Sequence, residues 1–159
     1  MTPREAFVAR AAKQILVFDG GYWTAIQGYK LSEADYRGSL ELTHDQKGNN
    51  DLLSITRPDV VGAIHSAYLS AGADMIETNT FGATKISMAD YGCEHLVQQL
   101  NIDSAKLARA CCDAAEAEDG KRRFVAGSIG PTNKTLSLSP DVNDPGYREI
   151  DFDYLKGVY

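Results

Sequence analysis

Residues 15–21 read ILVFDGG, which is four apolar residues, an acid and two glycines. A short apolar run that ends in glycine is typical of a buried strand stopped by a turn. Two further runs, over 73–78 and 124–128, have the same character and are also followed by turn residues. Helical patterns separate the second run from the third. Because strands that alternate with helices are joined by crossovers and run parallel, the sequence predicts an α/β fold.

The helical patterns define the remaining elements. The clearest begins after Thr56, where Thr56 and Asp59 form a capping-box pattern, and its apolar face ends at Gly72. The segment 22–55 carries turn signals and is predicted to be irregular. Further helices are predicted over 84–91, 93–100 and 103–118 and near 151, with a loop rich in Ser, Asn, Asp and Pro before the last one.

Composition excludes several classes of protein. The 159 residues suit one domain, and a hydrophobic share of 43% excludes intrinsic disorder. The longest strongly apolar run has four residues, too few for a membrane span or for the core of a signal peptide, so we expect a cytoplasmic protein with no membrane partner. A formal net charge of -6 with no clustered basic face argues against a nucleic-acid partner.

The three predicted strands end in polar groups or exposed backbone. These ends are 19–21, 77–80 and 127–132. Because the carboxyl ends of parallel strands meet at one edge of a sheet, and functional residues gather there, these segments form the candidate site.

Five segments together resemble cobalamin-dependent methionine synthases of the homocysteine S-methyltransferase family. They are residues 15–21, 47–51, 72–81, 125–133 and 139–144. The resemblance covers nearly the whole chain after about residue 14. It implies part of the amino-terminal homocysteine-binding domain, which is a (β/α)8 TIM-type barrel. In the full family enzyme, zinc activates the homocysteine thiolate, which takes a methyl group from cobalamin.

The length of the chain limits what the resemblance implies. A (β/α)8 barrel needs about 250 residues. We therefore expect residues 1–159 to form a single, incomplete barrel domain of about three βα units, with 1–13 as an N-terminal extension. The cysteines that hold the family's zinc lie on later strands, so we expect no cofactor in this chain alone; zinc and cobalamin belong to the full enzyme.

The resemblance also gives roles to the strand-end residues. Asp19 is expected to accept hydrogen bonds from the amino group of homocysteine. The backbone N–H groups of Gly20 and Gly21 are expected to donate hydrogen bonds to the carboxylate of homocysteine. Glu77 and Asn79 share one face of the predicted strand, so each is either a substrate contact or part of an inward polar layer. Thr132 is either a lining residue or part of a loop shaped by glycine and proline.

Residues with metal-binding side chains are interpreted as structural. Cys111 and Cys112 lie in a predicted helix, where neighbouring side chains point about 100° apart and cannot easily bind one ion together. Cys93 is also expected to be a core residue. His65 lies beside an apolar stripe, so a surface or half-buried position is predicted. No metal site is therefore predicted in this chain.

One position departs from the family pattern. The family has a small Met-Gly-Thr where this chain has Tyr22, Trp23 and Thr24. A tryptophan cannot cheaply adopt the positive φ of glycine, and it fills space near the substrate. Homocysteine binding by this chain is therefore expected to be weak or absent.

Other readings of the sequence stay open. The chain is expected to contribute homocysteine binding to a methionine synthase and to be inactive alone. The alternative is a truncated, non-catalytic chain that self-associates as a half-barrel or pairs with a partner that completes the barrel. A third possibility is an unrelated α/β binding module.

Overall fold

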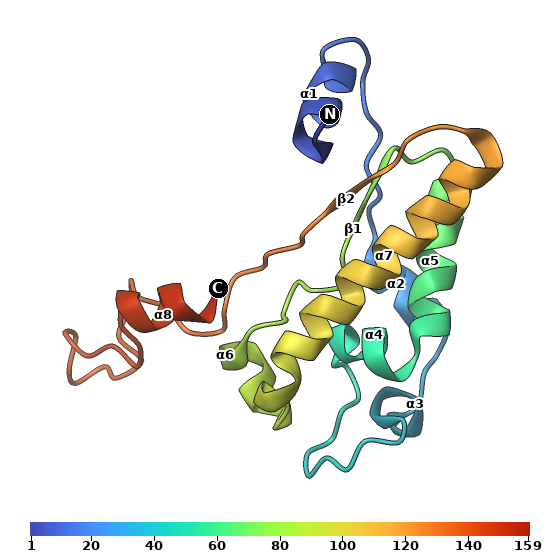
Figure 1. Cartoon of the computed structure of the whole chain (residues 1–159). Helices are drawn as coiled ribbons and strands as arrows, with labels where there is room; N and C mark the ends of the chain where they lie inside the picture. Colours follow the sequence, from blue (N-terminus) through green and yellow to red (C-terminus); the bar gives the residue numbers. More distant parts are fainter.

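The computed structural model describes residues 1–159 as an α/β fold in which helices cover one face of a small parallel sheet (Figure 1). In chain order the elements are α1 (Pro3–Ala11), α2 (Tyr22–Gly28), α3 (Glu33–Arg37), η1 (Asn50–Leu52), α4 (Leu53–Thr56), α5 (Pro58–Ser70), β1 (Met75–Glu77), α6 (Lys85–Met88), η2 (Ala89–Tyr91), η3 (Glu94–Leu96), α7 (Val97–Asp119), β2 (Phe124–Ala126) and α8 (Phe152–Val158).

Two of the three predicted strands form the sheet. β1 and β2 pair in parallel, with Ile76 opposite Val125 at the centre of the register. The predicted strand over 15–19 reduces to one parallel bridge, between Phe18 and Met75. Ile15 is 91% exposed, so its predicted burial is wrong. The segment pairs with β1 through that one bridge, and its residues Ile15, Val17 and Phe18 are exposed.

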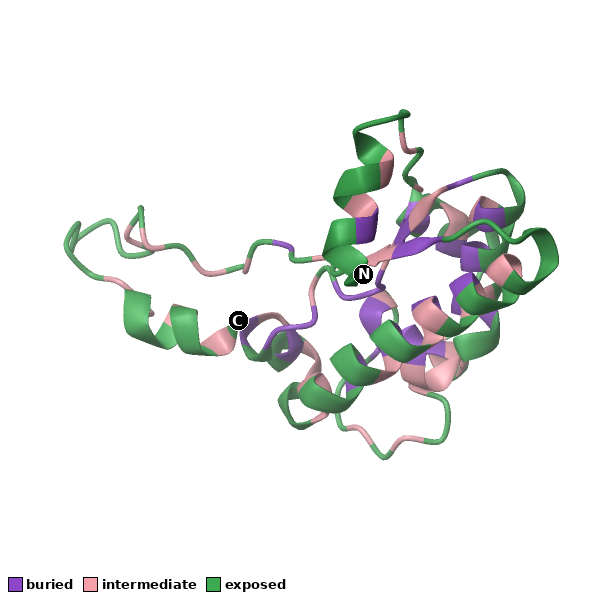
Figure 2. Ribbon diagram, turned by 45° about the horizontal axis from the view of Figure 1, so that its top comes forward, coloured by how far each residue is buried: buried purple, intermediate pink, exposed green.

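The core has three parts. The largest joins α2, α3 and α4 to α5, the second joins η1 and α6 to α7, and the third lies between the sheet and the long helices α5 and α7. Ile76 from β1 packs against Leu69 of α5 and against Ala108 and Cys112 of α7. The buried residues lie among the helices and between them and the sheet, whereas the loop before α8 and α8 itself are mostly exposed (Figure 2). The layer between the sheet and the helices is the rigid platform from which the strand ends project.

The segment 22–55 is helical in part, which corrects the prediction of an irregular segment. α2, α3, η1 and α4 all lie in it, and they bury Tyr22, Ile26, Tyr36 and Leu53 against α5. Each helix has seven residues or fewer, too short to show a clear apolar period. The start of α3 could have been predicted from the sequence, because Ser32 and Asp35 form a capping box.

The structure differs from the predicted helices at α7 and at the start of α5. α7 runs unbroken through the gap predicted between 100 and 103, and Leu100 and Ser104 are both fully buried in it. α5 begins at Pro58 without the predicted cap, because the Thr56 hydroxyl bonds to the carbonyl of Leu52 instead. The N-terminal extension forms α1.

α1 is attached to the start of both strands. Arg10 forms an ion pair with Asp74, just before β1. Phe7 packs edge-on against Phe124, with ring centroids 5.4 Å apart. Since both contacts lie at the amino ends of the strands, α1 closes that end of the sheet and leaves the carboxyl ends free.

The chain leaves the sheet after β2 as a long loop that leads to α8 (Figure 1). α8 buries none of its residues, and Phe152 is 68% exposed. No helix of the structure combines the length and the apolar character needed to cross a membrane.

Candidate functional site

Asp19 lies where the bridged segment ends, beside the last residue of β1. Both of its carboxylate oxygens accept the backbone N–H of Glu77, at 3.2 and 3.1 Å. Burial raises the pKa of Asp19 to about 6, only partly opposed by this hydrogen bond. No Lys or Arg side chain is hydrogen-bonded to Asp19, so its charge is available to a cationic ligand.

A cavity of about 260 Å³ opens at the same edge of the sheet. It is lined by Gly21, Tyr22, Trp23, Thr24, Glu77 and Phe81. Two of the predicted site residues, Gly21 and Glu77, therefore line one cavity, and the hydrogen bond to Glu77 places Asp19 next to it.

The two glycines present free backbone donors. The N–H groups of Gly20 and Gly21 have no acceptor within the chain. Nothing lies within 4 Å of a Cβ built on Gly20, so the approach to its backbone is open. Gly21 has a φ of +21°, which side chains rarely adopt, and it begins α2. The approach to Gly20 is therefore open, whereas the hydroxyl of Tyr68 lies 3.3 Å from the position of a Cβ built on Gly21.

Asn79 is not brought to this cavity. Its Nδ2 donates to the carbonyl of Asn50 at 2.8 Å and to Ser54 Oγ at 3.2 Å, and the side chain is buried. The prediction that Glu77 and Asn79 share one face is wrong, because β1 ends at Glu77 and the strand alternation ends with it. Asn79 instead ties the strand end to η1 and α4.

Thr132 lines a second cavity of about 330 Å³, together with Asn49, Asp51, Trp23 and Phe81. Its hydroxyl donates to the carbonyl of Lys134 at 2.9 Å, a bond that shapes its own loop. The second cavity is separated from the first by the aromatic pair Trp23 and Phe81, because both rings line both cavities.

Asp51 lines the second cavity, and the sequence analysis did not select it. It is 5% exposed, and its carboxylate accepts the N–H of Gly82 through both oxygens at 3.2 Å. Burial raises its pKa to about 6. The sequence did contain a signal for Asp51, because residue 51 is the last residue of the segment 47–51, which carries part of the family resemblance.

Trp23 is not strained. It lies in the first turn of α2, and Lys30 is the only residue other than glycine with a positive φ. The expected backbone conflict at this position is therefore wrong. The expected filling of space is consistent with the structure, because Trp23 lines the cavity and is 47% exposed.

The residues present do not fit a zinc ion. No group of three or more His, Cys, Asp or Glu side chains is arranged to hold a metal. Cys111 and Cys112 lie in α7 as predicted, and their thiols contact different elements, at the carbonyls of Gly62 and Phe124. Burial raises the pKa of the Cys112 thiol to about 11, which disfavours the thiolate that binds zinc.

His65 corrects another prediction. It is fully buried rather than at the surface, and neither ring nitrogen has a hydrogen-bond partner. Its ring packs against Tyr22, with centroids 5.4 Å apart. Burial lowers the pKa of His65 to about 4, so the ring is neutral at physiological pH.

Solved structures of related proteins match this fold. The homocysteine methyltransferase MmuM from Escherichia coli aligns in its metallated form with a TM-score of 0.62 and 25% sequence identity. Its oxidized form aligns with a TM-score of 0.63 and 27% identity. Each alignment covers 82% of this chain but only 42% and 41% of MmuM, so the chain spans less than half the length of that relative.

The family is settled by a broader match. The family model for homocysteine S-methyltransferase matches residues 16–159, which is nearly the whole chain. The partial structural match agrees with the resemblance carried by the strand-end segments, and the α/β fold with two parallel strands corresponds to part of the family's barrel. The chain belongs to the homocysteine S-methyltransferase family.

Proposed function

We propose that this chain binds the amino-acid end of homocysteine and contributes that binding to a methyl transfer of the methionine synthase type. The observation that carries the proposal is the strand-end cavity, where the Asp19 carboxylate lies beside the free N–H groups of Gly20 and Gly21. An amino acid is a zwitterion, and it needs one acid for its ammonium group and a set of donors for its carboxylate.

The roles of the individual residues follow from their chemistry. Asp19 accepts the ammonium group as an ionised carboxylate. Gly20 and Gly21 donate to the substrate carboxylate. Glu77, whose side chain lines the cavity, adds a second negative charge on the ammonium side. Phe81 supplies an apolar wall for the methylene groups of the substrate, and Trp23 narrows the cavity beside it.

The chemical step is assigned outside this chain. In the family, zinc lowers the pKa of the homocysteine thiol, but the cysteines and histidines present here do not fit that ion. We therefore propose that the chain alone transfers no methyl group from methylcobalamin, and that its contribution is to position the substrate.

The binding proposal is tested by NMR titration of the 159-residue chain with L-homocysteine under reducing conditions. We expect shifts of the amide signals of Gly20 and Gly21. Asp19→Asn should weaken binding at least tenfold, about 1.4 kcal/mol, because it removes the charge that accepts the ammonium group. Asp153→Asn, on exposed α8, is the matched control and should bind like the parent. Equal affinity of parent and Asp19→Asn would refute the role of Asp19.

The activity proposal has its own assay. Methylcobalamin and homocysteine are incubated with the chain, with a full-length family enzyme in parallel. We expect no methionine above the buffer background. Turnover that is lost in Asp19→Asn but kept in Asp153→Asn would mean that the chemical step is carried by this chain.

A further inference from the structure

The turn after β1 places Phe81 at both strand-end cavities. Its ring lines the cavity beside Asp19 and the second cavity, and it meets the ring of Trp23 with centroids 5.5 Å apart. Phe81 is 43% exposed, so burial of the ring alone does not fix where it lies. The position of the ring therefore depends on what holds the backbone of the turn 80–82.

Asp51 holds this turn by hydrogen bonds from its carboxylate. Both oxygens accept the N–H of Gly82, each at 3.2 Å, and the N–H of Phe81 also favours the charged form of the carboxylate. A Cβ built on Gly82 would lie 2.8 Å from Oδ2 of Asp51, which is closer than a real Cβ approaches another atom. A glycine at this position therefore permits the contact, and a larger residue would push the carboxylate away.

The segment that carries Asp51 is itself fixed. Asp51 lies in η1, and the next residue, Leu52, is fully buried. Asn79 donates to the carbonyl of Asn50 at 2.8 Å, which ties η1 to the end of β1. The hydrogen bonds of Asp51 therefore join a fixed element to the turn that carries Phe81.

Gly130 holds the same turn from the segment after β2. Its N–H donates to the carbonyl of Phe81 at 3.1 Å, and a Cβ built on Gly130 would overlap that oxygen. The turn is thus held by backbone contacts from two segments, and Asp51 supplies the only side chain among them.

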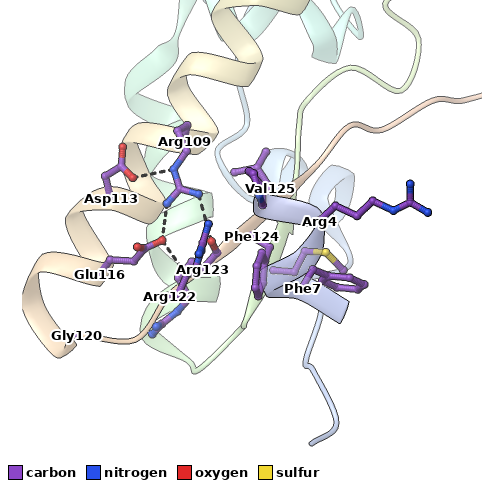
Figure 3. Close-up of a pocket in the computed structure, with 12 residues that line it drawn as sticks. Arg4, Phe7, Arg109, Asp113, Glu116, Gly120, Arg122, Arg123, Phe124 and Val125 are labelled. Carbon is purple, nitrogen blue, oxygen red and sulfur yellow. Dashed lines mark hydrogen bonds and ion pairs between the residues drawn. The ribbon is translucent and has the colours of Figure 1, made fainter. Parts of the chain in front are cut away.

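Asp51 differs from the acids beside the largest cavity, which has a volume of about 820 Å³ and lies between α7 and α1 (Figure 3). There Asp113 and Glu116 both pair with Arg109, so their charges are compensated. The hydrogen bonds of Asp51 go to backbone N–H groups instead. Because a buried carboxylate without a cation costs stability, folding alone gives no reason for an acid here, whereas the position of the turn does.

We propose that Asp51 is a positioning residue for homocysteine, which fixes the turn 80–82 and so holds the Phe81 ring as the wall for the methylene groups of the ligand. Asp51 lies outside the cavity beside Asp19 and does not touch the ligand itself. The inference rests on the proposed homocysteine site. It makes the affinity of that site depend on a residue that acts only through Phe81.

The first test reports the position of the ring without any ligand. We expect NMR cross-peaks between the ring protons of Trp23 and Phe81 in the parent, in Asp51→Asn, which keeps an oxygen acceptor, and in Asp90→Ala. Asp90 is the matched control, because it lines the second cavity but accepts from Asn133 rather than from the turn. The cross-peaks should be lost in Asp51→Ala. If they persist in an Asp51→Ala protein that circular dichroism shows to be folded, the proposal is wrong.

The second test is NMR titration of the same proteins with L-homocysteine. Asp51→Ala should weaken binding by about three- to tenfold, the value of one aromatic contact, whereas Asp51→Asn and Asp90→Ala should bind within about twofold of the parent. Phe81→Ala should weaken binding by the same factor as Asp51→Ala. Adding Asp51→Ala to Phe81→Ala should have no further effect, because the ring through which Asp51 acts is gone. Losses that multiply in the double variant overturn the proposal.

Gly82→Ala keeps the proposal testable if Asp51→Ala does not fold, because it separates Gly82 from the carboxylate and leaves the buried space filled. It should lose the ring cross-peaks and weaken binding as Asp51→Ala does. A folded Gly82→Ala with the cross-peaks and affinity of the parent overturns the proposal. Failure of the proposed function gives a different result, since the parent itself would then not bind homocysteine while the ring cross-peaks would still respond to Asp51→Ala.

Discussion

Trp23 and Phe81 meet edge-to-face between the two cavities of the strand-end site, with ring centroids 5.5 Å apart and an interplanar angle of 83°. Such pairs contribute about 0.5–1.5 kcal/mol beyond the burial of their area. One ring comes from α2 and the other from the loop after β1, so the pair joins the two segments that carry Gly21 and Glu77. The contact between the two rings therefore stabilises the site and also narrows the opening between its two cavities.

Trp23→Ala tests whether the Trp23 ring mainly stabilises the site or mainly hinders homocysteine from entering it. We expect tighter homocysteine binding, by about three- to tenfold, because removal of the indole joins the two cavities and opens the approach to Gly21. Alanine keeps the helical backbone of α2, where glycine would cost about 1 kcal/mol. The readout is the NMR titration used for Asp19. Tyr29→Ala removes an exposed aromatic ring at the other end of α2 and serves as the control. Equal or weaker binding in Trp23→Ala would mean that the ring is part of the pocket wall.

The pH dependence of binding follows from Asp19. The ammonium group of the ligand requires the ionised carboxylate, and burial raises the pKa of Asp19 to about 6. Affinity should therefore be constant above pH 7 and fall as pH drops through 6, approaching about tenfold per pH unit below 5. Titrations between pH 5 and 8 measure this. A profile that is flat down to pH 5 would show that Asp19 is not the acceptor.

The local sequence predicted the strands and helices whose signals are contained in their own residues. The runs over 73–78 and 124–128 and the helix that ends at Gly72 have clear apolar patterns bounded by glycine, and the structure has strands and a helix there. The run over 15–19 has an equally apolar pattern, but it is buried only if strands pair on both of its sides. Whether strands pair on both sides depends on residues far away in the sequence, so it cannot be predicted from the run itself.

The candidate site was predictable in part for the same reason. Asp19, Gly21 and Glu77 meet because the ends of parallel strands meet, which is a rule of the fold. Asn79 turns away because β1 ends two residues before it, and Asp51 arrives through a loop contact with Gly82. Contacts of this second kind come from tertiary packing, and no local spacing encodes them.

His65 should destabilise the chain in acid. The folded state holds the ring neutral with a pKa of about 4, whereas the unfolded chain binds a proton near 6.5. Stability is therefore lost as pH falls from 6.5 towards 4, by up to about 3 kcal/mol. His65→Leu removes this loss together with two unpartnered buried nitrogens, so it should be more stable than the parent at pH 7 by about 1 kcal/mol and by more at pH 5. Urea unfolding at both pH values gives the comparison, with exposed His95→Leu as control. A variant less stable than the parent at pH 5 would contradict this account.

Asp51 should destabilise the chain at neutral pH, whereas His65 should destabilise it in acid. Its pKa is raised from 3.8 in the unfolded chain to about 6 by burial, so between these values the folded state binds more protons than the unfolded one. Stability therefore falls as pH rises from about 4 to 6, and the loss persists at neutral pH. No cation offsets it, because the carboxylate is hydrogen-bonded to backbone N–H groups, chiefly that of Gly82. Asn keeps an oxygen for that N–H and carries no charge. Asp51→Asn should therefore raise the free energy of unfolding by about 2 kcal/mol at pH 7.5 and leave it nearly unchanged at pH 4. Urea unfolding at the two pH values is the measurement, and Asp153→Asn, which alters an exposed acid, should shift neither. If Asp51→Asn destabilised the chain at pH 7.5, the Asp51 charge would have to be compensated by a contact that its surroundings do not contain.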